Sequence, residues 1–279
     1  MKLIKRLAFS SLTIVVLFLN SCNPNNVTID NSLGKHFEDN HVTGTFAMFD
    51  NGQGRFTVYN LPRYRDSAFL PASTFKIVNS LIGLQTGKVV NEKMIIKWDG
   101  VVRMHSNGKP ADEWNKDLTM EEAFAVSAVP YYQEVARRIG KDTMQFWLDS
   151  LRYGNHVIGG TIDSFWLNNS LKITPDEQLG LVKKLYFEQL PFQKRVQGIV
   201  KKMMVRENNA NYVLAYKTGT GTLENGNTVG WVVGWVEENR HPYFFVLNVE
   251  GNPSIDIPTV RLNMLKAILK QLGFLEGKR

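Results

Sequence analysis

The chain has 279 residues, 43% hydrophobic and 21% charged, a composition that excludes a disordered, collagen-like or multi-span membrane protein. A single cysteine and five scattered histidines exclude a disulfide framework and any zinc-ribbon spacing, so we expect no metal. The formal net charge is +7, but Lys and Arg are interspersed with Glu and Asp, and we therefore expect no nucleic-acid partner.

The first 22 residues have the pattern of an export signal. Three basic residues precede an apolar stretch over residues 7–19, which is too short for a permanent membrane span. We expect residues 1–21 to be a signal peptide and the protein to be exported to the periplasm. Leu19-Asn20-Ser21-Cys22 resembles the bacterial lipoprotein box, so Cys22 is a candidate for lipidation and for a membrane anchor. A plain signal peptide with an incidental thiol is the alternative.

The next segments predict a tether followed by a hairpin. Residues 22–40 are polar and rich in asparagine, which favours a tether leading to one catalytic domain over residues 41–279. Two β-rich runs, at 43–50 and 55–59, flank Asn-Gly, the dipeptide that most strongly indicates a hairpin.

The middle and the end of the chain differ in pattern. From about residue 71 to 205 the apolar residues take helical spacing. Strand character returns at 212–217, 228–236 and 243–249, and residues 258–272 form an amphipathic helical pattern. This order predicts an α/β (α+β) fold, in which an antiparallel sheet built from both chain ends is flanked by helices and the middle is mainly helical.

A candidate nucleophile stands where the first long helix begins. Ser73 and Lys76 are three residues apart, so the hydroxyl and the amine project from one helix face. The amine can take the serine proton only if a dry surrounding, which Phe75 and its apolar neighbours supply, suppresses its charge. Chance alone gives about one Ser-x-x-Lys in this composition. A helix cap with a solvated lysine is therefore the alternative.

A second motif, Lys217-Thr218-Gly219, ends a predicted strand and is followed by Thr220. A cation and a hydroxyl beside a glycine on a strand edge offer an anionic substrate a charge, a hydrogen bond and open backbone. A hairpin turn with an exposed lysine is the alternative.

Together, Ser73-x-x-Lys76 and the later Lys217-Thr218-Gly219 resemble the serine β-lactamase and penicillin-binding superfamily. Between them lie Ser127-Ala128-Val129, Tyr153-Gly154-Asn155 and Phe165-Trp166-Leu167, a set that is similar to class D (oxacillinase-type) β-lactamases. The resemblance implies hydrolysis of β-lactams through a serine acyl-enzyme. A β-lactam sensor that stays acylated and a D,D-peptidase acting on cell-wall stems are the alternatives.

The resemblance assigns a role to each matching position. Ser73 is the acylated nucleophile, and Lys76, carbamylated by carbon dioxide to N6-carboxylysine, is the general base; no other cofactor is implied. Trp166 holds the carbamate through its indole N–H, unless it is merely a core aromatic, and Ser127 relays a proton to the lactam nitrogen. Thr218 and Arg261 bind the substrate carboxylate. The full set of substrate-binding positions is Val129, Lys217, Thr218, Gly219, Thr220 and Arg261.

Overall fold

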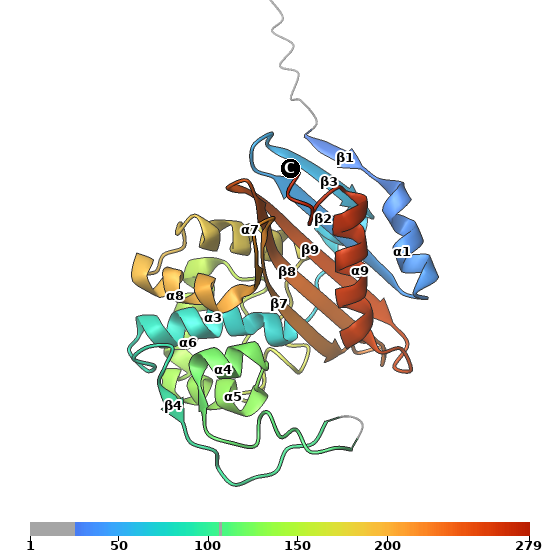
Figure 1. Ribbon diagram of the computed structural model, residues 1–279. Helices are drawn as coiled ribbons and strands as arrows, with labels where there is room; N and C mark the ends of the chain where they lie inside the picture. The colour runs from blue at the N-terminus through green and yellow to red at the C-terminus, as the bar shows by residue number, and fades with distance from the viewer. Residues whose placement is uncertain (1–25, 106–107) are drawn as a thin grey trace, which may run out of the picture.

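The computed structural model describes residues 26–105 and 108–279. A seven-stranded sheet in the order β1-β3-β2-β9-β8-β7-β6 forms its centre (Figure 1). β1 pairs with β3 in parallel, and all other pairs in this sheet are antiparallel. The strands are β1 (Val27–Ile29), β2 (Thr43–Asp50), β3 (Arg55–Tyr59), β6 (Val205–Asn208), β7 (Val213–Thr222), β8 (Thr228–Glu238) and β9 (His241–Gly251). The prediction of a sheet built from both ends of the chain is confirmed.

Helices cover both faces of this sheet (Figure 1). The first and last α-helices lie on one face, and the block made by the middle of the chain lies on the other. A small second sheet pairs β4 (Ile95–Ile96) with β5 (Leu118–Thr119). The helices are η1 (Asn31–Leu33), α1 (Gly34–Asp39), α2 (Leu61–Asp66), η2 (Ala72–Phe75), α3 (Lys76–Gln85), α4 (Met120–Ala125), α5 (Val129–Ile139), α6 (Lys141–Leu151), α7 (Pro175–Tyr186), α8 (Lys194–Met204) and α9 (Ile257–Gln271).

Alternation along the strands creates a hydrophobic core on each face of the sheet. On β8, Trp231, Val233 and Trp235 pack into the core under the helical block. Val232 and Val236 pack into the core under α9. The central strands are therefore buried on both faces, which fixes their register and gives the site a rigid support.

The fold begins earlier than the composition predicts. Residues 27–39, which we expected to belong to a tether, form β1, η1 and α1. Leu33 and Phe37 are fully buried, and the Phe37 ring stacks on Tyr59 with 4.7 Å between centroids. Leu33 and Phe37 pack this polar segment against the rest of the fold, together with the pairing of β1 with β3, so the predicted boundary at residue 41 is wrong. The predicted signal peptide and Cys22 lie outside the described residues.

The predicted hairpin is confirmed, with β2 and β3 paired from Phe46↔Tyr59 to Asp50↔Arg55. The Asp50 carboxylate accepts hydrogen bonds from the backbone of Gly52 and Gln53 and closes the turn. Within residues 26–105 and 108–279, no helix is long and apolar enough to cross a membrane.

Candidate active site

The predicted nucleophile lies at the junction of η2 and α3. Ser73 belongs to the 3-10 turn, and Lys76 is the first residue of the α-helix. The Lys76 amine donates a hydrogen bond to the Ser73 hydroxyl, with 2.8 Å between Nζ and Oγ. Ser73 is half-buried, whereas Lys76 is 1% exposed. The hydroxyl is therefore accessible from outside, while the amine stays out of water.

Burial changes the acidity of Lys76. Desolvation lowers its pKa from 10.5 to about 7, because a charged amine is poorly solvated among apolar groups. The ring of Tyr132 lies 5.5 Å from Nζ, measured to the ring centroid. Near neutral pH a large fraction of Lys76 is thus uncharged and able to accept a proton.

Trp166 belongs to an aromatic cluster that contacts the nucleophile turn. Its ring stacks on Phe75 with 5.4 Å between centroids and meets Phe165 edge-on at 5.1 Å. The backbone carbonyl of Trp166 accepts a hydrogen bond from Ala72 at 3.1 Å, next to Ser73. The indole Nε1 is buried and has no hydrogen-bond partner among the described residues. A buried donor without an acceptor is rare in folded proteins.

Lys217 and Ser127 form a second lysine–serine pair. Lys217 Nζ donates to Ser127 Oγ at 2.9 Å and to the carbonyl of Thr218 at 3.0 Å. Lys217 is 1% exposed, and burial lowers its pKa well below the ordinary value, helped by the nearby cations Lys76, Arg206 and Arg261.

The loop between α4 and α5 holds Ser127 in a strained conformation. Its φ of 59° lies in the left-handed region, which costs free energy for a residue other than glycine. The backbone of Ala128 donates to Ala123 at 2.8 Å, and Trp114 Nε1 donates to the carbonyl of Val126 at 3.0 Å. Val129, two residues after Ser127, is half-buried and begins α5. These bonds fix the serine against Lys217.

β7 approaches η2 so closely that Gly219 has no room for a side chain. A Cβ atom there would lie 2.8 Å from the carbonyl oxygen of Pro71 and 3.2 Å from the amide of Thr74. Trp231 Nε1 donates to the carbonyl of Leu70 at 2.9 Å and fastens the same turn to β8. The glycine therefore brings the strand that carries Lys217 against the turn that carries Ser73.

Arg261 reaches this strand from α9. It is 7% exposed and donates hydrogen bonds to the carbonyl of Gly219 and the hydroxyl of Thr220. Gly230 on β8 allows α9 to lie close to the sheet, because a Cβ there would lie 2.4 Å from Ile257 Cγ2 on the same helix. Burial lowers the pKa of Arg261 to about 10, so it stays a cation at neutral pH. Thr218, half-buried, contributes its carbonyl to Lys217.

The Tyr153-Gly154-Asn155 motif is a turn that supports the aromatic cluster. Tyr153 meets Phe75 edge-on at 5.6 Å. Asn155 donates to the carbonyl of Ser170 at 2.8 Å and accepts from the amide of Lys172 at 3.0 Å. The turn thus fixes the segment that follows Trp166.

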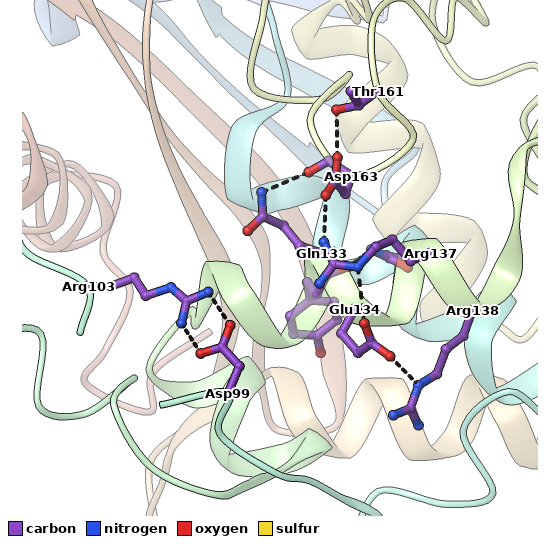
Figure 2. Close-up of polar contacts among 10 residues, drawn as sticks. Asp99, Arg103, Gln133, Glu134, Arg137, Arg138, Thr161 and Asp163 are labelled. Atoms are coloured by element: carbon purple, nitrogen blue, oxygen red, sulfur yellow. Dashed lines mark hydrogen bonds and ion pairs between the residues drawn. The ribbon is translucent and has the colours of Figure 1, made fainter. Parts of the chain in front are cut away.

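A polar network on α5 fixes the segment that precedes Trp166 (Figure 2). Arg137 pairs with the Asp163 carboxylate, and Gln133 Nε2 donates to the Asp163 carbonyl at 3.1 Å. Thr161 Oγ1 donates to the same carboxylate at 2.6 Å. Sequence reasoning missed this network, because Asp163 carries no local signal of its distant partners.

Two further residues beside the site were missed. Tyr132 faces Lys76, and its hydroxyl lies 2.8 Å from Ser80 Oγ. Arg206 is close enough to Lys217 to affect its pKa. The sequence does not predict this, because a lone arginine after a helix is typical of a surface residue. Among the described residues, no group of three or more His, Cys, Asp or Glu could hold a metal ion.

Residues 38–270 match the family described as penicillin binding protein transpeptidase domain. A probable β-lactamase of Bacillus subtilis, YbxI, is 42% identical over 232 residues, which cover 83% of this chain and 82% of YbxI. The regulatory protein BlaR1 of Bacillus licheniformis is 32% identical over 216 residues, 77% of this chain but 34% of BlaR1. The crystal structure of a class D β-lactamase from Nostoc superimposes with a TM-score of 0.81 at 36% identity, covering 88% of this chain and all of that one. The chain therefore belongs to the penicillin-binding transpeptidase family, and within it this protein is a class D β-lactamase.

Proposed function

We propose that the protein hydrolyses β-lactams through an acyl-enzyme on Ser73, with Lys76, carried as N6-carboxylysine, as the general base. The observation that supports this most is the buried Lys76 amine, 2.8 Å from Ser73 Oγ, with a pKa of about 7. Only an uncharged amine adds carbon dioxide. The carbamate would supply an anion that accepts a proton first from Ser73 and later from water.

The unpaired indole N–H of Trp166 supports a carbamate on Lys76. Its Nε1 is buried, and no described residue accepts its hydrogen. A carbamate oxygen is such an acceptor, and a hydrogen bond to an anion is stronger than one between neutral groups. Trp166 would hold the modified side chain, while Phe75 keeps the indole ring in place by stacking at 5.4 Å.

The remaining residues would serve bond making and bond breaking in acylation. Ser73 Oγ loses its proton and bonds to the lactam carbonyl carbon, whose oxyanion is held by the backbone amides of Ser73 and Thr220. The carbon–nitrogen bond then breaks, and Ser127 delivers its proton to the leaving nitrogen. Lys217 Nζ, 2.9 Å away, replaces that proton. Arg261 and Thr218 would bind the substrate carboxylate.

Turnover of nitrocefin by the mature protein, with and without added bicarbonate at fixed pH, tests the proposal. We expect many turnovers per enzyme and higher activity with bicarbonate. Ser73→Ala should form no covalent adduct by mass spectrometry, and Lys76→Ala should lose deacylation. A stoichiometric burst without turnover would instead support a sensor like BlaR1 and overturn hydrolysis. Normal turnover by Lys76→Ala would remove Lys76 from the mechanism.

We also propose that the protein is exported and that lipid is attached at Cys22. The apolar stretch over residues 7–19 and the lipoprotein-like sequence that ends at Cys22 support this. Mass spectrometry of the mature N-terminus should show a diacylglycerol-modified Cys22. An unmodified or absent Cys22 would refute the anchor.

A further inference from the structure

A β-bulge places Arg206 beside the second lysine–serine pair. In the ladder between β6 and β7, Val205 pairs with Ala215, and Glu207 pairs with the adjacent Leu214. Two steps along β6 thus oppose one step along β7, and Arg206 is the extra residue. A bulge redirects the side chain that it carries, and bulges are frequent next to active sites.

Aromatic and backbone contacts hold the redirected guanidinium. Arg206 Cζ lies 5.8 Å from the centroid of the Phe124 ring and 6.0 Å from that of Tyr216. Its Nε donates a long hydrogen bond, 3.4 Å, to the carbonyl of Tyr216, the residue before Lys217. No described carboxylate forms an ion pair with it, although Glu207, the next residue, binds Lys266.

Phe124 is shared between this arginine and the lysine of the site. Lys217 Nζ lies 5.6 Å from the same ring centroid to which Arg206 is close. A ring that attracts both cations allows two positive groups to be near each other without a carboxylate between them. The charge of Arg206 is permanent, because a guanidinium does not lose its proton in proteins.

We infer that Arg206 is a positioning residue of this enzyme, whose fixed positive charge favours the release of a proton from Lys217 to Ser127. This inference rests on the proposed function, in which Lys217 restores the proton that Ser127 gives to the leaving nitrogen. An acid works best when it neither holds its proton too firmly nor loses it too early. A neighbouring cation lowers the pKa of a buried ammonium and so makes it release its proton more readily.

Before any carbamate forms on Lys76, the charged groups around Lys217 all act in the same direction. Lys76 faces it from α3, Arg261 from α9 and Arg206 from β6, and each lowers its pKa. Ser127 and the carbonyl of Thr218 accept its hydrogen bonds. Of the three cations, Lys76 is also the proposed base and Arg261 the proposed carboxylate ligand. Arg206 is the one that can be changed without removing either.

Titration of the Lys217 side chain by NMR tests the inference. In protein labelled with ¹³Cε-lysine, the Lys217 signal is identified by its loss in Lys217→Arg. We expect Arg206→Gln to raise the pKa of Lys217 by about half a unit or more, since one nearby cation is lost. Arg206→Lys keeps the charge and should titrate close to wild type. Lys202→Gln removes an exposed charge at the end of α8 and serves as the matched control.

Stopped-flow acylation by nitrocefin at fixed bicarbonate gives the second measurement. In the pH dependence of the acylation rate, the pKa assigned to Lys217 should be higher in Arg206→Gln than in wild type. It should be unchanged in Arg206→Lys and Lys202→Gln. Arg206→Met, which keeps the aliphatic stem, replaces Arg206→Gln if that variant is unfolded by circular dichroism. An unmoved Lys217 titration in the folded charge-free variant, or an equal shift in Arg206→Lys, overturns the inference. If wild type forms no acyl-enzyme, the proposed function fails, and the NMR result still decides the role of Arg206.

Discussion

Replacing Trp166 by phenylalanine removes the indole N–H but keeps an aromatic ring, so it distinguishes the contribution of the hydrogen bond from that of the packing. The ring that remains can still stack on Phe75, which lies 5.4 Å away between centroids. The proposed hydrogen bond to a carbamate on Lys76 would be lost, and a hydrogen bond to a charged group contributes about 1.5–3 kcal/mol. Because 1.4 kcal/mol corresponds to a factor of ten, the carbamylation equilibrium should weaken by roughly 10- to 150-fold.

The assay is nitrocefin turnover as a function of bicarbonate concentration. Trp166→Phe should need correspondingly more bicarbonate for half-maximal activity and should recover turnover when bicarbonate is saturating. ¹³C NMR with labelled bicarbonate should show the carbamate signal appearing at the same higher concentration. The unmodified enzyme loses no hydrogen bond at Nε1, so its stability should fall only by the cost of the small cavity, about 1–2 kcal/mol.

Trp147 offers the matched control. It is half-buried and stacks on Phe192 with 4.4 Å between centroids. Trp147→Phe should leave the bicarbonate dependence unchanged. The reasoning is refuted if Trp166→Phe shows the wild-type bicarbonate dependence, or if saturating bicarbonate fails to restore turnover in a folded protein.

Three further predictions concern Lys76, Gly219 and Arg261. The pKa of Lys76 is about 7 in the folded protein and 10.5 ordinarily, so the unfolded chain binds more protons between these values and the free energy of unfolding should rise with pH there. Urea denaturation without carbon dioxide should show Lys76→Met to be the more stable protein at pH 6, with the difference shrinking by pH 10. Gly219→Ala would press its methyl group on the Pro71 carbonyl, 2.8 Å away, and should lower kcat/KM by about 10- to 100-fold; an unchanged acylation rate would contradict this. Arg261→Ala should chiefly raise KM, by about tenfold or more, through lost carboxylate binding, whereas an unchanged KM would mean that another cation binds that group.

The sequence predicts contacts between residues that are close in the chain better than contacts between residues that are far apart. Ser73 and Lys76 are one helical turn apart, so local geometry alone places the hydroxyl near the amine. The pairing of β2 with β3 is also local. Arg261 lies 44 positions after Lys217, and only the family resemblance linked the two. The structure shows why that link needs tertiary contacts, because Arg261 reaches Gly219 by crossing β8 at Gly230.

The features that the sequence did not reveal depend on irregular structure. Arg206 points at the site because β6 gains one residue against β7, and no residue pattern announces that bulge. Residues 27–39 look like a tether by composition, yet Leu33 and Phe37 fasten them. Asp163 acquires its role only when α5 brings Arg137 to it. In each case the structure depends on contacts between residues that are far apart in the sequence. Composition and periodicity do not predict such contacts.

The charge balance of the site favours the binding of anions over the stability of the free protein. Lys76, Lys217 and Arg261 are all buried, and among the described residues none of them forms an ion pair with a carboxylate. Burying three basic groups together without a carboxylate disfavours their charged forms, as the lowered pKa values of all three indicate. An anion that enters the site relieves this repulsion. In the proposed reaction the substrate carboxylate, the oxyanion and the carbamate are all anionic, so these basic groups would stabilise each of them.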